Sequence, residues 1–208
     1  LTTNRNHGTL TNMEVGDWVA DTGSGGVRAL DFDGTNDYVS VGNQPTLNFG
    51  TGNFSLSFWM KTNSNLRRSI CNKFVYSGTP VDEQGFYVDI QANGTLRTSI
   101  ETPGPSVSFR VRDSSIAVND GVWHHVAVVR TGVSNFLDIY IDGVLRNGST
   151  LSNGTVGSIS CNAEFEIGRE WDEVSQGNTG FFIGQIDDFR IFSRNLSTTE
   201  ITALASQR

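Results

Sequence analysis

The sequence predicts an all-β protein: a two-sheet antiparallel β-sandwich of the jelly-roll type, with a short C-terminal helix. Short runs of alternating apolar and polar residues recur along the chain, which is typical of strands with one buried face. Turn-forming residues separate these runs about every 8–12 residues, the spacing of a sandwich. The 208 residues include 23 glycines and 13 phenylalanines, and no helix-forming run of Ala, Leu, Glu or Lys. We expect one domain over residues 1–208.

The first strong signal lies at residues 30–41, LDFDGTNDYVSV, after a loop-rich opening with one short strand near residues 10–13. Two alternating runs flank a polar turn that contains Asp33 and Gly34, and Asp-Gly favours a tight turn because glycine adopts positive φ easily. The turn also concentrates carboxylate and carbonyl oxygens, the ligands that calcium prefers. Two interpretations remain: an ordinary hairpin with a solvated acidic tip, or part of a calcium site.

The segment 54–62 predicts a central strand of the sandwich. Phe54, Leu56, Phe58 and Met60 share one face, and serines and Trp59 share the other. An Asp142-Gly143 pair between two strands predicts a hairpin. Near the end, Ser197 and Glu200 have the spacing of a capping box, which predicts a short helix. We expect the remaining strands at residues 67–74, 85–90, 95–100, 107–111, 121–130, 136–141, 144–147, 161–168 and 181–192.

Composition limits the partners. A net charge of −7 and a pI near 4.9 argue against nucleic acid, because phosphate binding requires a basic face. No run of 18 apolar residues exists, so we expect no membrane span. The chain starts at Leu1 without a signal peptide, which we interpret as a mature or excised piece of a longer protein. Five Asn-x-Ser/Thr sequences are weak indicators of glycosylation, at Asn53, Asn93, Asn147, Asn153 and Asn195.

Two residue pairs could carry chemistry. Cys71 and Cys161 could form a disulfide in an oxidising compartment if their Cα atoms lie within about 7 Å, or remain two buried thiols. His124 and His125 are neighbours on a predicted strand and point to opposite faces, so they cannot chelate one ion together. We expect His125 to lie on the solvent side or to form a hydrogen bond across the sheet.

Five segments, in their order and spacing, resemble the laminin-G-like (concanavalin A-like lectin/glucanase) jelly roll. The resemblance extends from about Asn4 to Ile201, and it implies one concave and one convex antiparallel sheet with loops around the rim. The family usually begins with one more strand, which this chain lacks, so a sheet edge is expected to be open or filled by another chain. The five segments are LDFDGxxDYV from Leu30, FSLSFW from Phe54, GVWHHVAV from Gly121, IYIDG from Ile139 and GQIDDFRIF from Gly184.

The resemblance also implies calcium, because many relatives hold an ion that clamps the start of the fold to the last strand. Transferred to this sequence, Asp187 would supply a side-chain oxygen and Gly34 a backbone carbonyl. Asp33 is a weaker addition. The alternative is that Asp187 and Asp188 only cap a strand or pair with Arg190.

Some relatives are retaining β-glucanases, which need two carboxylates about 5–5.5 Å apart. Glu164 and Glu166 share one face of a predicted strand and are the nearest candidates. However, the relatives' motif has an Asp between its glutamates and another Glu beyond, whereas Gly168 and Arg169 follow here. We therefore expect no enzyme.

The leading hypothesis is a non-catalytic, extracellular or cell-surface, calcium-stabilised binding or adhesion module that recognises carbohydrate or a surface protein. Sugar rings stack on exposed aromatic side chains. Trp171 with Asp172 is the first candidate site and Tyr76 the second, unless Trp171 folds back over the core edge. The runner-up is a structural subunit that assembles with copies of itself through an open sheet edge, in a filament or surface layer.

Overall fold

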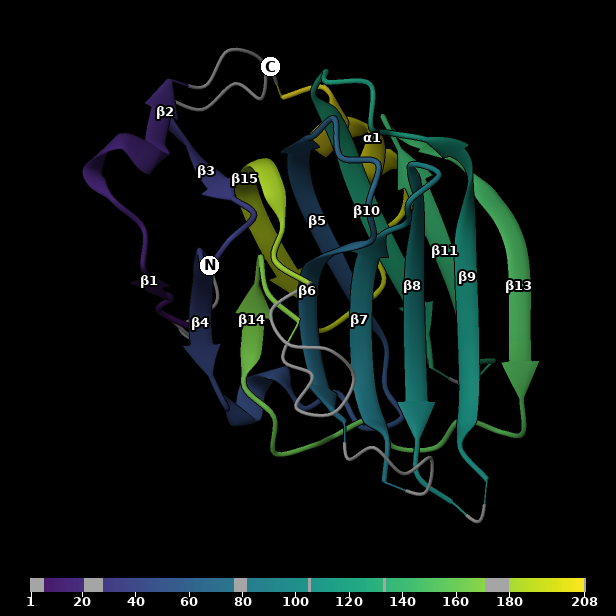
Figure 1. Cartoon of the computed structure of the whole chain (residues 1–208). Coiled ribbons are helices and arrows are strands. Elements are labelled where there is room, and N and C mark those ends of the chain that lie inside the picture. Colours follow the sequence, from purple (N-terminus) through teal and green to yellow (C-terminus); the bar gives the residue numbers. More distant parts are fainter. Residues whose placement is uncertain are drawn as a thin grey trace.

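The computed structural model describes residues 6–20, 28–76, 82–104, 106–132, 134–170 and 180–207. Their strands form two stacked antiparallel sheets, as the sequence predicts (Figure 1). We call the sheet nearest the viewer in Figure 1 the front sheet, the other the back sheet, and their outward sides the front face and the back face. Within the described residues, the front sheet has the order β1 (Thr9–Thr11), β4 (Tyr38–Gly42), β14 (Phe165–Ile167), β6 (Arg68–Val75), β7 (Gln84–Ile90), β8 (Thr95–Thr102), β9 (Ser108–Ala117) and β13 (Asn147–Asn153).

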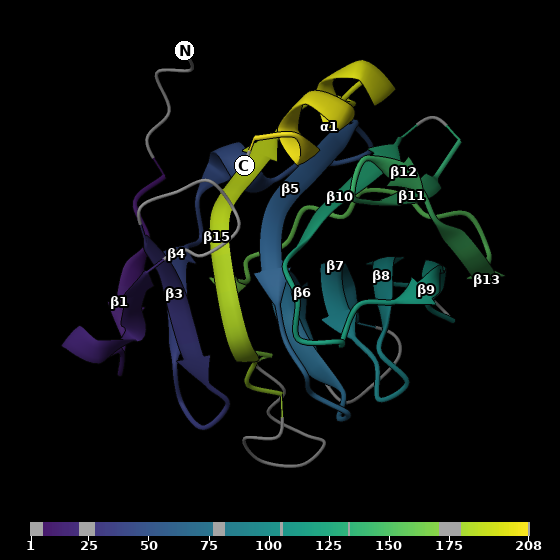
Figure 2. The ribbon, with the colours of Figure 1, turned by 90° about the horizontal axis from the view of Figure 1, so that it is seen from above.

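The back sheet, for the described residues, has the order β12 (Val144–Leu145), β11 (Phe136–Ile141), β10 (His124–Thr131), β5 (Phe54–Lys61), β15 (Ile183–Phe192), β3 (Arg28–Asp33) and β2 (Trp18–Ala20). Figure 2 shows the back sheet from above, with β3, β15 and β5 side by side. Two 3₁₀ turns, η1 (Val15–Asp17) and η2 (Pro45–Leu47), lie in connections, and the helix α1 (Thr198–Ala205) packs on the back face. At eight residues α1 is too short to cross a membrane, and the described residues form no other helix that could.

Strand β5 behaves as its alternation predicts. Phe54, Leu56, Phe58 and Met60 point between the sheets and belong to the main hydrophobic core. On the other side, Ser55 bonds to the backbone that leads into α1, accepting from Leu196 N at 3.0 Å. Both faces of β5 are therefore buried, which makes it the central strand of the sandwich.

The turn after β3 does not close a hairpin. Asp33 ends a strand of the back sheet, whereas Tyr38 begins a strand of the front sheet, so the turn carries the chain from one sheet to the other. Its own side chains satisfy its backbone: Asp33 Oδ1 accepts from Thr35 N at 2.7 Å, and Asp37 Oδ2 accepts from Asp33 N at 2.9 Å. The ordinary-hairpin interpretation is thus wrong, because β3 and β4 belong to different sheets and do not pair with each other.

Two other local predictions are confirmed. Asp142 and Gly143 both have positive φ and join β11 to β12 in a hairpin, with Ile141 opposite Val144. Ser197 and Glu200 form the capping box at the start of α1. Strand bounds fit less well: the segment predicted at 161–168 is a strand only over Phe165–Ile167, and β13 extends far beyond the predicted 144–147.

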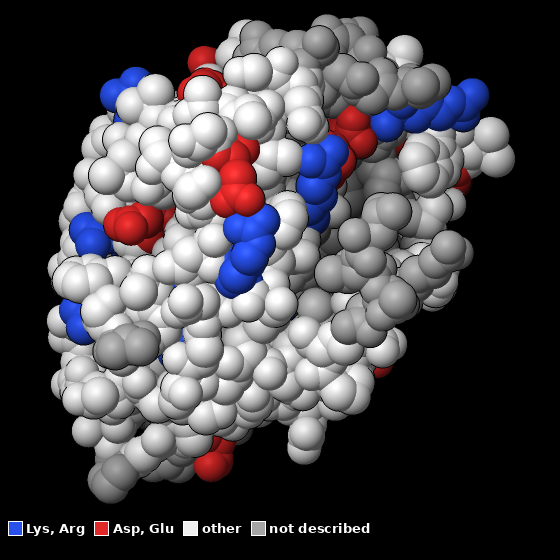
Figure 3. All heavy atoms as spheres, turned by 180° about the vertical axis from the view of Figure 1, so that it is seen from behind, with Lys and Arg blue, Asp and Glu red and all other residues white. Residues whose placement is uncertain are grey.

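Figure 3 shows the molecule from behind, where side chains of both charge signs lie among a mostly uncharged surface. Inside, Arg130 is a fully buried cation on β10, and burial lowers its pKa to about 10. Its guanidinium donates to Gly50 O at 2.8 Å, to Asn135 Oδ1 at 3.2 Å and to Gly157 O at 3.4 Å. It thereby joins three loops at one end of the sandwich.

We expect Arg130→Met to lower the free energy of unfolding by about 2–4 kcal/mol, because it leaves buried acceptors without a donor. Urea unfolding followed by tryptophan fluorescence measures the change. The control is Arg194→Met, which removes an exposed ion pair with Glu200 and should lower stability much less. Equal losses in the two variants would contradict the structural role of Arg130.

Candidate functional site

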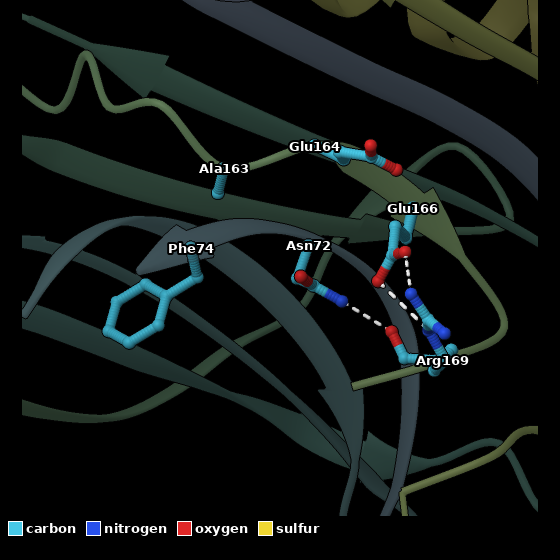
Figure 4. A pocket seen from close by; sticks show the side chains of 6 residues that line it. All are labelled: Asn72, Phe74, Ala163, Glu164, Glu166 and Arg169. Carbon is cyan, nitrogen blue, oxygen red and sulfur yellow. Dashed lines mark hydrogen bonds and ion pairs between the residues drawn. The ribbon is translucent and has the colours of Figure 1, made fainter. Parts of the chain in front are cut away.

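A hollow of about 350 Å³ opens on the front face, beside β6 and β14. It combines hydrogen-bonding groups of both polarities with one aromatic ring, as Figure 4 shows. Such a mixture suits a small polar ligand with one apolar surface. The side chains that line it are Asn72 and Phe74 from β6, Ala163 and Glu164 before β14, Glu166 within β14, and Arg169 after it.

Strand register explains why these groups meet. Glu166 lies directly opposite Asn72, and both point outward because their neighbour Phe165 fills the core. Phe74 lies two residues further along β6 on the same face. At Gly168, with φ +86°, a Cβ atom would lie 2.4 Å from Phe32, so only glycine allows the turn that brings Arg169 over the sheet.

Arg169 is held in place on several sides. Its guanidinium pairs with Glu166, and it stacks on the ring of Tyr38, 3.8 Å from the centroid. The amide of Asn72 donates to its backbone oxygen. Burial raises the pKa of Glu166, while Arg169 favours the charged form. The floor of the hollow is thus a pre-organised, charge-neutral pair.

Lys73 supports the opposite wall. Its amine is buried and donates to Asn43 Oδ1 at 2.8 Å and to the backbone oxygen of Ala163. Burial lowers its pKa. The sequence did not predict this contact, because the partners of Lys73, at Asn43 and Ala163, are 30 and 90 residues away along the chain.

A band of alternating charges crosses the front face beside the hollow. Arg67 bridges buried Asp89, at 2.6 Å, and Glu170, at 2.9 Å. Two strands away, Arg97 pairs with Asp113 at 2.7 Å. Burial raises the pKa of Asp89 although Arg67 opposes the shift. Arg67 thereby ties Glu170, the residue after Arg169, to the buried carboxylate of Asp89 on β7.

The predicted metal ligands lie apart. Asp33 is opposite Ile183 in the β3–β15 register, four residues before Asp187. At about 3.3 Å per residue this separates them by about 13 Å, whereas two oxygens on one calcium ion lie within about 5 Å of each other. Gly34 follows Asp33 and is further away. Calcium binding stays a prediction, and this register argues against the ligand set from which it was inferred.

The carboxylates in question already have local partners. Asp187 Oδ1 accepts from the backbone N–H of Asp188 at 2.7 Å, and Asp188 pairs with Arg190 at 2.6 Å. An ion pair with Arg190 was the alternative to calcium binding expected from the sequence, and Asp188 forms that ion pair. Within the described ranges, no three His, Cys, Asp or Glu side chains are grouped closely enough to hold a metal ion.

The other predicted residues have different outcomes. Trp171 and Asp172 lie outside the described residues, although Arg169 and Glu170 lead directly to them. Tyr76 is half-buried just beyond β6 and does not line the hollow. Cys71 and Cys161 are both buried free thiols, so the possible disulfide is not formed.

The glutamate pair and the histidine pair were correctly placed on their faces. Glu164 lines the hollow together with Glu166. Its carboxylate accepts a hydrogen bond from Ser40 Oγ at 2.7 Å, whereas Glu166 pairs with Arg169. His125 is buried on the back-sheet side and its Nε2 lies 2.9 Å from Ser57 Oγ, which is the expected bond across the sheet.

His124 points the other way. Its two ring nitrogens lie 2.8 Å from Asp142 and 3.2 Å from Asp120, so only the imidazolium can donate to both, and its pKa is raised.

The sequence matches a family model described as the concanavalin A-like lectin/glucanases superfamily over residues 33–202. Among curated relatives, the sushi, von Willebrand factor type A, EGF and pentraxin domain-containing protein 1 of Mus musculus is 34% identical over 93 residues. That match covers 43% of this chain and 3% of the relative. The chain thus spans a small fraction of the length of this relative.

Solved structures agree on the fold. The binding domain of Paraclostridial Mosquitocidal Protein 1 superposes with a TM-score of 0.65 at 15% identity, covering 95% of this chain and 45% of that one. A heptameric SAP-like pentraxin from Limulus polyphemus superposes with a TM-score of 0.56 at 20% identity, covering 85% and 80%. At these identities the likeness concerns architecture alone.

A calcium titration tests the separation of the predicted ligands. Because Asp33 and Asp187 do not share a coordination shell, we expect Asp187→Ala to respond to EDTA and to excess calcium as wild type does, with calcium-dependent shifts in melting temperature that agree within about 1 °C. A calcium-dependent rise of several degrees that this variant loses would show that Asp187 does ligate an ion.

The two histidines should respond to pH in opposite directions. Burial lowers the pKa of His125 to about 4, so the unfolded chain takes up the proton first and stability falls as pH drops from about 6.5 to 4. We expect this loss to reach about 2–3 kcal/mol and to disappear in His125→Gln.

The pKa of His124 is raised in the folded protein, so the folded state holds this proton more tightly than the unfolded chain does. The resulting stabilisation is complete below about pH 6.5 and is lost as the pH rises through the pKa of His124 in the folded state. Urea unfolding of wild type, His124→Gln and His125→Gln between pH 4 and 8 measures both effects. Parallel pH profiles for the two variants would be inconsistent with these assignments.

Proposed function

Because the chain belongs to the concanavalin A-like lectin/glucanases superfamily, we propose that it is a non-catalytic binding module that recognises carbohydrate on its front face. The observation that carries this proposal is the hollow lined by Asn72, Phe74, Glu164, Glu166 and Arg169. Binding domains among the similar structures support a binding role in general. The sugar specificity is our inference from the lining.

The lining fits a hydroxyl-rich ligand. Ring hydroxyls need donors and acceptors at fixed positions, and the guanidinium of Arg169 with the carboxylate of Glu164 provides both. Phe74 offers an apolar surface on which a sugar ring can pack. Arg169 balances Glu166, and the amine of Lys73, which interacts electrostatically with Glu164, lies behind the wall of the hollow. With the charges balanced in this way, the hollow favours neutral sugars over strongly charged ones.

The same contacts argue against glycoside hydrolysis. A retaining glycosidase needs one ionised carboxylate free to attack and a second one poised to give a proton. Glu166 is committed to Arg169 by two contacts, and Glu164 is bonded to Ser40. Neither carboxylate is left as a free nucleophile in this arrangement.

We further propose an extracellular or cell-surface setting, with a glycan or a surface protein as the partner. The pentraxin domain-containing protein of the mouse, and the structural likeness to the binding domain of a mosquitocidal protein, support such a setting without assigning it to this chain. Calcium could add to binding only through oxygens other than the set inferred from the sequence.

The hollow can be tested by a single substitution. We expect Phe74→Ala to weaken binding of the preferred glycan about five- to tenfold, because a ring contact of this kind contributes about 1 kcal/mol. Screening wild type on a glycan array identifies the ligand, and isothermal titration measures the affinity of both proteins.

The matched control is Trp18→Ala, which removes an exposed ring from β2, at the far edge of the back sheet, and should leave the affinity unchanged. If wild type binds no glycan, or if both substitutions weaken binding equally, the front-face hollow is not a carbohydrate site. Binding of a surface protein would then become the leading hypothesis for the function of the module.

A further inference from the structure

Strand β13 is an edge strand without the features that usually prevent edge pairing. Its outer side has no neighbouring strand among the described residues, and all five residues from Ser149 to Asn153 are exposed. Natural edge strands are protected by charge, proline or short length. The seven residues of β13, NGSTLSN, include no charge and no proline. The bulge between Asn147 and Thr150 protects only its first half.

Exposed apolar side chains gather on the same side of the sandwich. Of ten large hydrophobic residues that are exposed in the described part of the chain, four lie on β11, β12 and β13. They are Phe136, Val144, Leu145 and Leu151, each exposed by 48–56%. Figure 2 shows β12 and β13 at the same end of the two sheets, so one partner could cover both edges.

From this edge we propose that two copies of the chain pair through β13 as antiparallel strands, with the two-fold axis at Leu151. In a continuous sheet, paired residues must point to the same face, which this register satisfies. It places Leu151 opposite its copy, Thr150 opposite Ser152, and Ser149 opposite Asn153. The exposed leucines then cover each other, and hydroxyl and amide groups meet across the remaining pairs.

The β13 strand of a second copy fits this edge better than β1 does, the strand at the opposite edge of the front sheet. The opposite edge strand, β1, has three residues and cannot match the length of β13. Each protomer carries a net charge of −7, so self-association requires a neutral contact, and β13 supplies one. A two-fold pairing is also closed, which limits assembly to a dimer instead of a filament.

Pairing would join two front sheets into one continuous surface. Leu151 lies in a row of directly paired, outward-facing residues that reaches the hollow. The row runs Leu151, Val111, Ser99, Tyr87, Asn72 and Glu166. Both hollows of a dimer would therefore open on the same face, where a polymeric ligand could reach both. The pairing itself does not depend on the proposed carbohydrate binding.

Charge-swapped variants test the axis. We expect wild type to sediment as a concentration-dependent dimer in analytical ultracentrifugation, and Leu151→Lys and Leu151→Glu each to dimerise at least about tenfold more weakly. An equimolar mixture of the two should recover the dimer, because only a two-fold at this residue places Lys opposite Glu. Leu10→Lys, on β1, is the matched control and should dimerise like wild type.

Crosslinking locates the contact. Directly opposite residues in an antiparallel pair have Cβ atoms about 4.5–5.5 Å apart, near the distance that a disulfide spans. Leu151→Cys should therefore form a covalent dimer on mild oxidation, whereas Leu10→Cys should not. Circular dichroism confirms that each variant is folded. A wild type that stays monomeric at high concentration, or a dimer weakened by Leu10→Lys instead, would overturn the proposal.

Discussion

The burial of Glu166 is the constraint on which the front face depends. A carboxylate that is 3% exposed would be costly without a cation, and Arg169 supplies that cation three residues later. To do so the chain must turn at Gly168, the position where no side chain fits against Phe32. One ion pair thus connects the end of a three-residue strand, the aromatic core and the shape of the hollow.

Much of the fold could be predicted from local patterns. The alternation of β5, the Asp142-Gly143 hairpin and the capping box of α1 each depend on residues close together in sequence, and each was confirmed. The path of the chain after Asp33 was harder to predict. The sequence of a tight polar turn is the same whether its two strands pair with each other or enter different sheets. Pairing partners about 150 residues away, such as Ile183 for Asp33, decide between the two.

The hollow and β13 show what local patterns miss. Glu164 and Glu166 were correctly assigned to one face, but the roles of Lys73 and Arg169 depend on contacts between separate strands and on how deeply each charge is buried. Strand β13 has little apolar alternation, since both of its faces are wet, and its neutral polar residues resemble a loop. Sequence periodicity detects burial, and a strand at an open edge has little burial to detect.

The position of β15 has a consequence for how the protein is made. This last strand lies inside the back sheet, between β5 and β3, rather than at its edge. While the chain is still being synthesised, the edges of β5 and β3 that pair with β15 have no partner strand until residues 183–192 leave the ribosome. The back sheet can close only after residues 183–192 have emerged, so the strands made earlier must stay soluble during that interval.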